Sequence, residues 1–189
     1  NKFFIKDNFC LLEYYPSKNI KIFNNKIVYA QIDFINKINS IKTKYDNFFL
    51  ASASCLSFND ITIQIQSRLN NFQKVRHDRK ILDFVNKELI TFKNKIIYEL
   101  HKKWPYQTNK KLNQKFQILS PSDFGLQNIL KYKNSYKFID FEYFGWDDPV
   151  KLISDFYFHS GMNLSDGQKK LWLDEITKVF SPAIIPRLN

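Results

Sequence analysis

The chain has 189 residues, of which 44% are hydrophobic and 17% aromatic, enough apolar material for the core of one domain. This composition is unlike that of a disordered segment, and no apolar run reaches the roughly 18 to 20 residues that a membrane-spanning helix needs. The formal net charge is +11, but only four of the 29 basic residues are arginine. Nucleic-acid recognition favours arginine over lysine, because the planar guanidinium group can donate two hydrogen bonds at once. We therefore expect no membrane and no nucleic acid among the partners of this protein.

The cysteines and histidines do not suggest a metal site or a disulfide framework. Cys10 and Cys55 lie in apolar surroundings without a CxxC pattern, and the three histidines are far apart. Buried free thiols are typical of a reducing compartment, so we expect a cytoplasmic protein. The chain begins with Asn1 and its only methionine is Met162, which leads us to expect an excerpt of a longer protein.

The first half of the chain is predicted to be mostly helical. Residues 9–15 are apolar and aromatic and stop at Pro16, which predicts a buried strand, although no strand partner is visible nearby. Three stripes of apolar residues at helical spacing follow, and we expect them to pack in the core. They run through 28–44, through 61–72 with Asn59 or Asp60 as the N-terminal cap, and through 81–100, ending at Trp104.

The pattern changes after Pro105. Short strands are predicted at 116–119 and 136–141, and two more helices follow, one starting at Pro149 and one capped by Asp166. There is no internal repeat and no linker, so the sequence predicts one α+β unit over residues 1–189. Residues 116–189 carry eight basic and nine acidic side chains, whereas residues 1–115 carry 21 and nine, so the carboxylates are concentrated in the second part.

The positions of the glycines exclude two common phosphate-binding loops. No glycine precedes Gly125, so neither a P-loop nor a dinucleotide-binding GxGxxG motif fits within the chain. If nucleotide phosphates bind here, other residues must hold them.

The stretch from Leu119 to Phe156 carries the candidate chemistry. Asp123 precedes Asn128 by five positions in a loop, and Asp140 ends an apolar strand 17 residues after Asp123. Phosphoryl transfer needs a carboxylate that accepts the proton of the attacking hydroxyl, together with hard oxygen ligands for magnesium. An asparagine and an aspartate suit magnesium better than zinc. A lone Asp-x-x-x-x-Asn is more often a turn or capping pair, so the interpretation depends on the three residues together.

These residues resemble the aminoglycoside phosphotransferase and choline kinase family, the small-molecule relatives of protein kinases. That family has a His-Gly-Asp-x-x-x-x-Asn loop, an Ile-Asp-Phe-Glu strand and a Gly-Asp-Pro. The resemblance implies that Asp123 is the catalytic base and that Asn128 and Asp140 are the metal ligands. Residues 145–149, Gly-Trp-Asp-Asp-Pro, look like the Gly-Asp-Pro with one inserted residue.

Further positions follow from the same resemblance. Residues 11–16 are similar to the hinge strand whose main chain meets adenine, which implies that Glu13, Tyr14 and Tyr15 bind the nucleotide. Asp155 matches a structural acid of the helix after the Gly-Asp-Pro. Glu142 and Asp148 are also expected to be structural, as carboxylates that accept main-chain N–H bonds.

Two departures from the family pattern stand out. Ser120-Pro121-Ser122 replaces the residues around His-Gly, and we expect the hydroxyl of Ser120 or Ser122 to brace the catalytic loop in place of the histidine. Only about ten residues precede the hinge at about 9–15, whereas the family has a whole small lobe there. The resemblance thus implies a kinase-like large lobe without its N-terminal lobe, inactive when isolated.

The resulting hypothesis is an ATP- and Mg²⁺-dependent phosphotransferase that moves the γ-phosphoryl group to a hydroxyl of a small molecule, such as a sugar, an aminoglycoside or an amino alcohol. The basic charge of residues 28–115 favours a neutral or anionic acceptor. Two alternatives stay open: a catalytically degenerate kinase-like binding module, and a basic nucleic-acid-binding domain.

Overall fold

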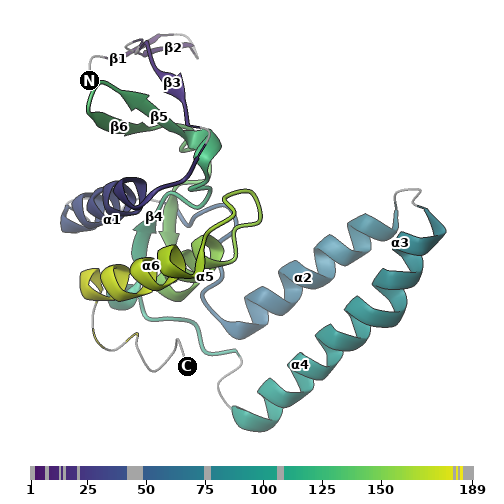
Figure 1. The fold of residues 1–189 in the computed structure, drawn as a ribbon. Helices are drawn as coiled ribbons and strands as arrows, with labels where there is room; N and C mark the ends of the chain where they lie inside the picture. Colours follow the sequence, from purple (N-terminus) through teal and green to yellow (C-terminus); the bar gives the residue numbers. More distant parts are fainter. Residues whose placement is uncertain are drawn as a thin grey trace.

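The computed structural model describes residues 3–6, 9–12, 14, 16–20, 22–41, 49–74, 78–105, 109–180, 182 and 184. Within them the chain is an α+β protein with three small antiparallel sheets (Figure 1). The strands are β1 (Phe3–Lys6), β2 (Phe9–Leu12), β3 (Lys18–Asn19), β4 (Ile118–Ser120), β5 (Ile129–Tyr132), β6 (Ser135–Phe138) and β7 (Gly145–Asp147). The helices are α1 (Asn25–Ser40), α2 (Phe58–Gln73), α3 (Arg79–Phe84), α4 (Ile90–Lys103), α5 (Pro149–Tyr157) and α6 (Asp166–Val179), with a π-helical turn η2 (Val85–Leu89) and 3₁₀ turns η3 (Gln114–Phe116) and η4 (Leu126–Asn128).

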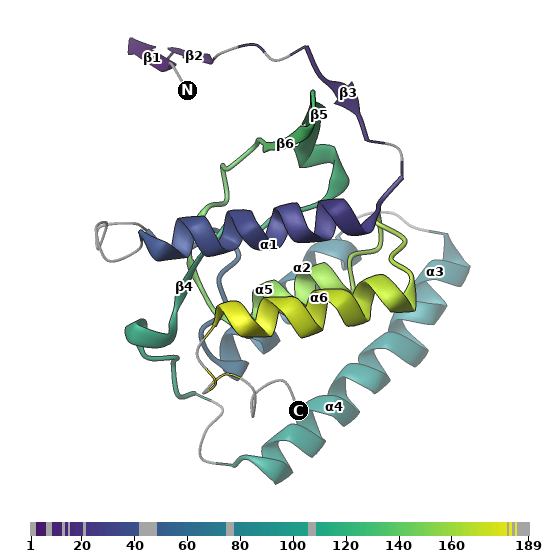
Figure 2. The ribbon, with the colours of Figure 1, turned by 60° about the vertical axis from the view of Figure 1, so that its left-hand side comes forward.

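The core lies between α1, α5, α6 and β4. Helices α1 and α6 run side by side, and both α1 and α5 pack on β4 (Figure 2). At the centre the fully buried Trp172 stacks on Phe156 with ring centroids 3.8 Å apart, and its indole N–H donates to the carbonyl of Ile153. The stripe predicted for the first helix is confirmed as core, because Val28, Ile32 and Ile35 are buried.

Helices α2 and α4 form a hairpin that projects from this core (Figure 1). Within 58–74 and 78–105 only Leu69 and Val85 are buried apolar residues, whereas Ile61 is 41% exposed and Phe92 61% exposed. The sequence correctly predicts both helices, but the prediction that their apolar stripes belong to the core is wrong. Helical periodicity shows that a helix has an apolar face and does not show that another element covers that face.

Two helix starts differ from the sequence prediction. Ser57 caps α2 by accepting the N–H of Asp60, and the Asp60 carboxylate in turn accepts the N–H of Ser57. Ser165 caps α6 in the same reciprocal way with Gln168, so Asp166 lies one position inside that helix. Serine is a favoured N-terminal cap because its short side chain lets the hydroxyl accept the N–H of the third helical residue.

Strand β2, predicted without a visible partner, pairs antiparallel with β1, where Phe4 lies opposite Leu11. A second sheet has the order β3-β5-β6, and a third joins β4 to β7. None of the helices in the described part of the chain is both long and apolar enough to cross a membrane. Cys55 is a buried free thiol, as predicted, and burial raises its pKa to about 11.

Candidate functional site

Strands β4 and β7 position the two loops that carry the predicted residues. They pair antiparallel with Leu119 opposite Trp146 and Ser120 opposite Gly145, so the loop after β4 starts beside the loop before β7. The outer edge of β4 is occupied by a side chain of α1: the Asn39 amide donates to the carbonyl of Leu119 and accepts its N–H, at 3.0 and 2.9 Å. On the other side, Trp146 forms a parallel bridge with Leu50.

Ser120 and Ser122 brace the loop that carries Asp123. Ser122 has a φ of 62°, a left-handed conformation that costs a non-glycine residue free energy. Its N–H donates to the Ser120 hydroxyl at 3.1 Å, and its own hydroxyl donates to the carbonyl of Tyr143 at 3.0 Å. The expected hydroxyl hydrogen bonds are therefore present, and the second of them ties the loop of Asp123 directly to the loop that follows Asp140.

Asn128 links the same two segments. Its Nδ2 donates to the main-chain carbonyl of Asp123 at 3.1 Å, and its own carbonyl accepts the N–H of Ile139 at 3.0 Å. The residue before Asp140 is thus held against the residue that ends the Asp123 loop. The Asp123 carboxylate accepts two hydrogen bonds from Gln127, at 2.9 and 3.2 Å.

A cluster of phenylalanine rings packs against both loops. Phe34 of α1 packs against Phe124, Phe138 and Phe141, with ring centroids 5.7, 4.7 and 5.6 Å away. Phe124 follows Asp123 and Phe141 follows Asp140, so the neighbours of the two carboxylates share one aromatic support. Phe34 was not identified from the sequence, because it is not one of the residues that form the apolar stripe of the predicted helix over 28–44.

The negative charges of three carboxylates in these loops all raise the pKa of the Tyr143 hydroxyl. Tyr143 has a raised pKa because its hydroxyl bonds to Glu142, and because the charges of Glu142, Asp140 and Asp123 all disfavour a phenolate there. Asp140 and Glu142 are exposed, and Asp140 has a φ of 64°. Asp123 and Asp140 are therefore both close enough to the Tyr143 hydroxyl for their charges to raise its pKa. Tyr143 was another residue missed by the sequence analysis.

The Gly-Trp-Asp-Asp-Pro segment is a structural support. Asp148 caps α5 by accepting the N–H of Val150, which agrees with the structural role expected for it. Asp147 is 0% exposed, and one of its oxygens accepts the N–H groups of Cys55 and Asp148. Its other oxygen lies 3.5 Å from the Lys151 ammonium group.

Burial raises the pKa of Asp147 to about 6, against the opposing influence of Lys151 and of the two N–H donors. Lys151 also pairs with Asp155, so Asp155 has a structural role as well. One signal in the sequence indicates this network: Lys151 and Asp155 are four residues apart on one side of α5, and Asp147, which ends β7, lies four residues before Lys151.

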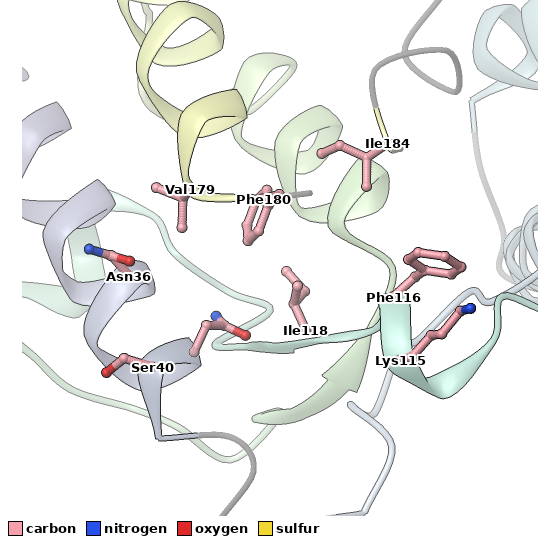
Figure 3. Close-up of a pocket in the computed structure, with 9 residues that line it drawn as sticks. Asn36, Ser40, Lys115, Phe116, Ile118, Val179, Phe180 and Ile184 are labelled. Carbon is pink, nitrogen blue, oxygen red and sulfur yellow. The ribbon is translucent and has the colours of Figure 1, made fainter. Parts of the chain in front are cut away.

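Of the three predicted hinge residues, Tyr14 is described and its side chain is 85% exposed. Glu13 and Tyr15 lie outside the described residues. A pocket of about 260 Å³ lies elsewhere, between the C-terminal ends of α1 and α6 and the start of β4 (Figure 3). Its walls include Asn36, Lys115 and Phe180, and none of the predicted site residues lines it.

Asn128 and Asp140 both carry side-chain oxygen atoms. The Nδ2 of the buried Asn128 is used by the Asp123 carbonyl, so Oδ1 is the atom that Asn128 offers to a cation. Together with the exposed Asp140 carboxylate this provides oxygen donors of the kind that magnesium prefers. No group of three His, Cys, Asp or Glu side chains within the described part of the chain could hold a metal by itself. A site of one amide and one carboxylate depends on phosphate and water for its other ligands, as magnesium sites with nucleotides commonly do.

Comparison of the chain with models of protein families, with curated proteins and with solved structures finds no match.

Proposed function

We propose that this chain is the large lobe of a kinase-like phosphotransferase, which moves the γ-phosphoryl group of ATP to a hydroxyl of a small molecule. The observation that carries the proposal is the joint placement of Asp123, Asn128 and Asp140. Phe34 supports the neighbours of both carboxylates, and Asn128 bonds to both segments. A site for phosphoryl transfer needs a base and metal ligands within reach of one nucleotide.

In this proposal Asp123 orients the acceptor hydroxyl and takes its proton. Gln127 holds the carboxylate in one orientation by two hydrogen bonds, which favours a fixed direction of attack. Asn128 and Asp140 hold Mg²⁺ against the phosphates, and the ion neutralises charge that develops on the transferred group. Ser122 keeps the base loop in register with the metal loop through its bond to the Tyr143 carbonyl.

The direct test is transfer of labelled γ-phosphate from ATP by the full-length protein to a panel of sugars, aminoglycosides and amino alcohols, with and without Mg²⁺. We expect Mg²⁺-dependent labelling of at least one acceptor class, and its loss in Asp123→Asn. Asp33→Asn is the matched control, since Asp33 is an exposed carboxylate paired with Lys37 on α1. Equal labelling by wild type and Asp123→Asn would refute the assignment of the base.

A second measurement tests the metal site apart from catalysis. Mn²⁺ can replace Mg²⁺ as a paramagnetic probe of the 189-residue chain, and it broadens the amide signals of residues near it. We expect selective broadening around Asn128 and Asp140, and its loss in Asp140→Ala. Broadening that is confined to other carboxylates would contradict the proposed ligands.

A further inference from the structure

Gln31 is a polar side chain in the middle of the buried face of α1. It is fully buried, and so are the apolar residues three or four positions away on the same face, which are Ile27, Val28 and Ile35. The Nε2 of Gln31 donates to the main-chain carbonyl of Phe124 at 2.8 Å, across 93 positions of sequence. The mechanism described above does not use this residue.

Packing alone does not account for a glutamine at this position. The Oε1 of Gln31 is buried and has no hydrogen-bond partner among the described residues. A buried polar atom without a partner destabilises the folded state, whereas methionine is also unbranched and has no such atom. The hydrogen bond from Nε2 to the Phe124 carbonyl is therefore what distinguishes glutamine here from an apolar residue of similar length.

The carbonyl that Gln31 binds belongs to the residue directly after Asp123. No other hydrogen bond to the Phe124 carbonyl is found in the described part of the chain. The preceding carbonyl, that of Asp123, accepts the Nδ2 of Asn128 at 3.1 Å. Two consecutive peptide groups are thus held by different elements, one by α1 and one by the end of η4. Since a peptide group is planar, the two bonds restrict the backbone at Phe124 and orient the plane that contains the Cα of Asp123.

Helix α1 is a firm support for this bond. Phe34, about one turn after Gln31, packs against the ring of Phe124 with centroids 5.7 Å apart. The helix therefore holds Phe124 both by its ring and by its carbonyl. Helix α1 is itself fixed to β4 by the Asn39 amide and runs beside α6 (Figure 2). A shift of the Asp123 loop away from α1 would break both of these contacts.

We propose that Gln31 is a positioning residue, which holds the loop of Asp123 at a fixed distance from α1 and so sets the direction of the Asp123 carboxylate. Its consequence for catalysis rests on the proposed function, because it requires Asp123 to be the base. The placement of the loop does not depend on any activity and is measured separately. A base acts through its geometry, and a misplacement of about 1 Å can cost about 10²-fold in rate.

Amide hydrogen exchange of the 189-residue chain tests the placement of the loop. Gln31→Met removes the donor and keeps an unbranched side chain, and Gln31→Leu is a second variant without the donor. Circular dichroism checks that both keep their helices. The amides of Asn128 and Ile139 report on the loop, because they bond to the carbonyls of Gly125 and Asn128. We expect both amides to exchange at least about tenfold faster in the two variants, while the amides of α6 change by less than about twofold.

Kinetics of the full-length protein, with an acceptor found in the panel described above, test the consequence for catalysis. We expect Gln31→Met to lower kcat by at least about tenfold. Val28→Ala is the matched control, since Val28 is fully buried on the same face of α1 and its side chain has no polar atom. The control should lower the urea midpoint more than Gln31→Met does, because it leaves a cavity, yet keep kcat within about twofold.

The possible outcomes distinguish a failure of this proposal from a failure of the proposed function. Unchanged exchange of the loop amides in both Gln31 variants would overturn the placement, and an unchanged kcat would overturn the consequence for catalysis. A kcat that falls as much in Val28→Ala as in Gln31→Met would show that Gln31 only stabilises the core. If the wild type transfers phosphate to no acceptor, the proposed function fails, whereas faster exchange confined to the loop would still support Gln31 as the residue that holds it.

Discussion

Gly145, the first residue of β7, is the position where we expect one added methyl group to have the largest effect. A Cβ at this position would lie 2.4 Å from the carbonyl oxygen of Phe49 and 2.5 Å from the amide nitrogen of Ala51. Both are backbone atoms, so a side-chain rotation cannot relieve the overlap. Such overpacking typically costs about 1–3 kcal/mol.

The displacement would also break two hydrogen bonds of 2.9 Å, from Trp146 to the carbonyl of Phe49 and from Ala51 to the carbonyl of Trp146. Each is worth about 0.5–1.5 kcal/mol. We expect Gly145→Ala to lower the free energy of unfolding by about 2 to 6 kcal/mol.

Urea denaturation followed by tryptophan fluorescence and circular dichroism measures this change. Gly167→Ala is the matched control, since Gly167 lies in the first turn of α6 and the nearest atom to its added Cβ is the Ser165 hydroxyl at 4.0 Å. Alanine is favoured over glycine in a helix, so the control should be stabilised by up to about 1 kcal/mol. A loss of less than about 1 kcal/mol in Gly145→Ala would refute the reasoning from close backbone approach.

Three more predictions concern carboxylates. Asp123→Asn in the full-length protein should lower kcat by about 10²- to 10⁴-fold in an assay of ADP release, and a loss below about tenfold would remove Asp123 from the base role. Asp140→Ala should abolish magnesium-dependent nucleotide binding in calorimetry, whereas Glu142→Gln should retain most of it; equal losses would contradict their separate roles. The folded state holds the proton of Asp147 more tightly than the unfolded state does, because burial raises its pKa from 3.8 to about 6. Relative to Asp147→Asn, the wild type should therefore lose up to about 3 kcal/mol of unfolding free energy as the pH rises from about 4 to about 7 in urea denaturation, and identical pH courses of the two proteins would argue against this.

Local pattern predicted the helices well because their causes are local. The apolar spacing of 28–44, the proline at 149 and the stripe at 81–100 each correspond to a helix in the structure. Even so, the cap of α2 was placed two or three residues too late, since Ser57, Asn59 and Asp60 are all capable caps and their choice depends on where the incoming chain turns. The exposure of α2 and α4 depends on the position of the whole hairpin, which no window of sequence contains.

Sequence order singled out Asp123, Asn128 and Asp140. In the structure Asn128 donates to the carbonyl of Asp123 and accepts the N–H of Ile139, the residue before Asp140. The sequence could not predict the aromatic cluster that supports this site. Phe34 lies 90 residues before Phe124 and contacts it only after α1 has packed against β4. The roles of the three residues in metal binding and catalysis stay predictions, which the variants above address.

The two-stranded β4–β7 sheet has a further consequence for how the protein behaves in crowded solution. An unpaired strand edge is a template for the strand of another molecule, and proteins with open edges tend to aggregate. Here the Asn39 amide imitates a neighbouring strand on one side and the short bridge at Leu50 closes the other. One side chain and one bridge thus cover the two edges of this very small sheet. This part of the chain therefore leaves no strand edge open for pairing with another molecule.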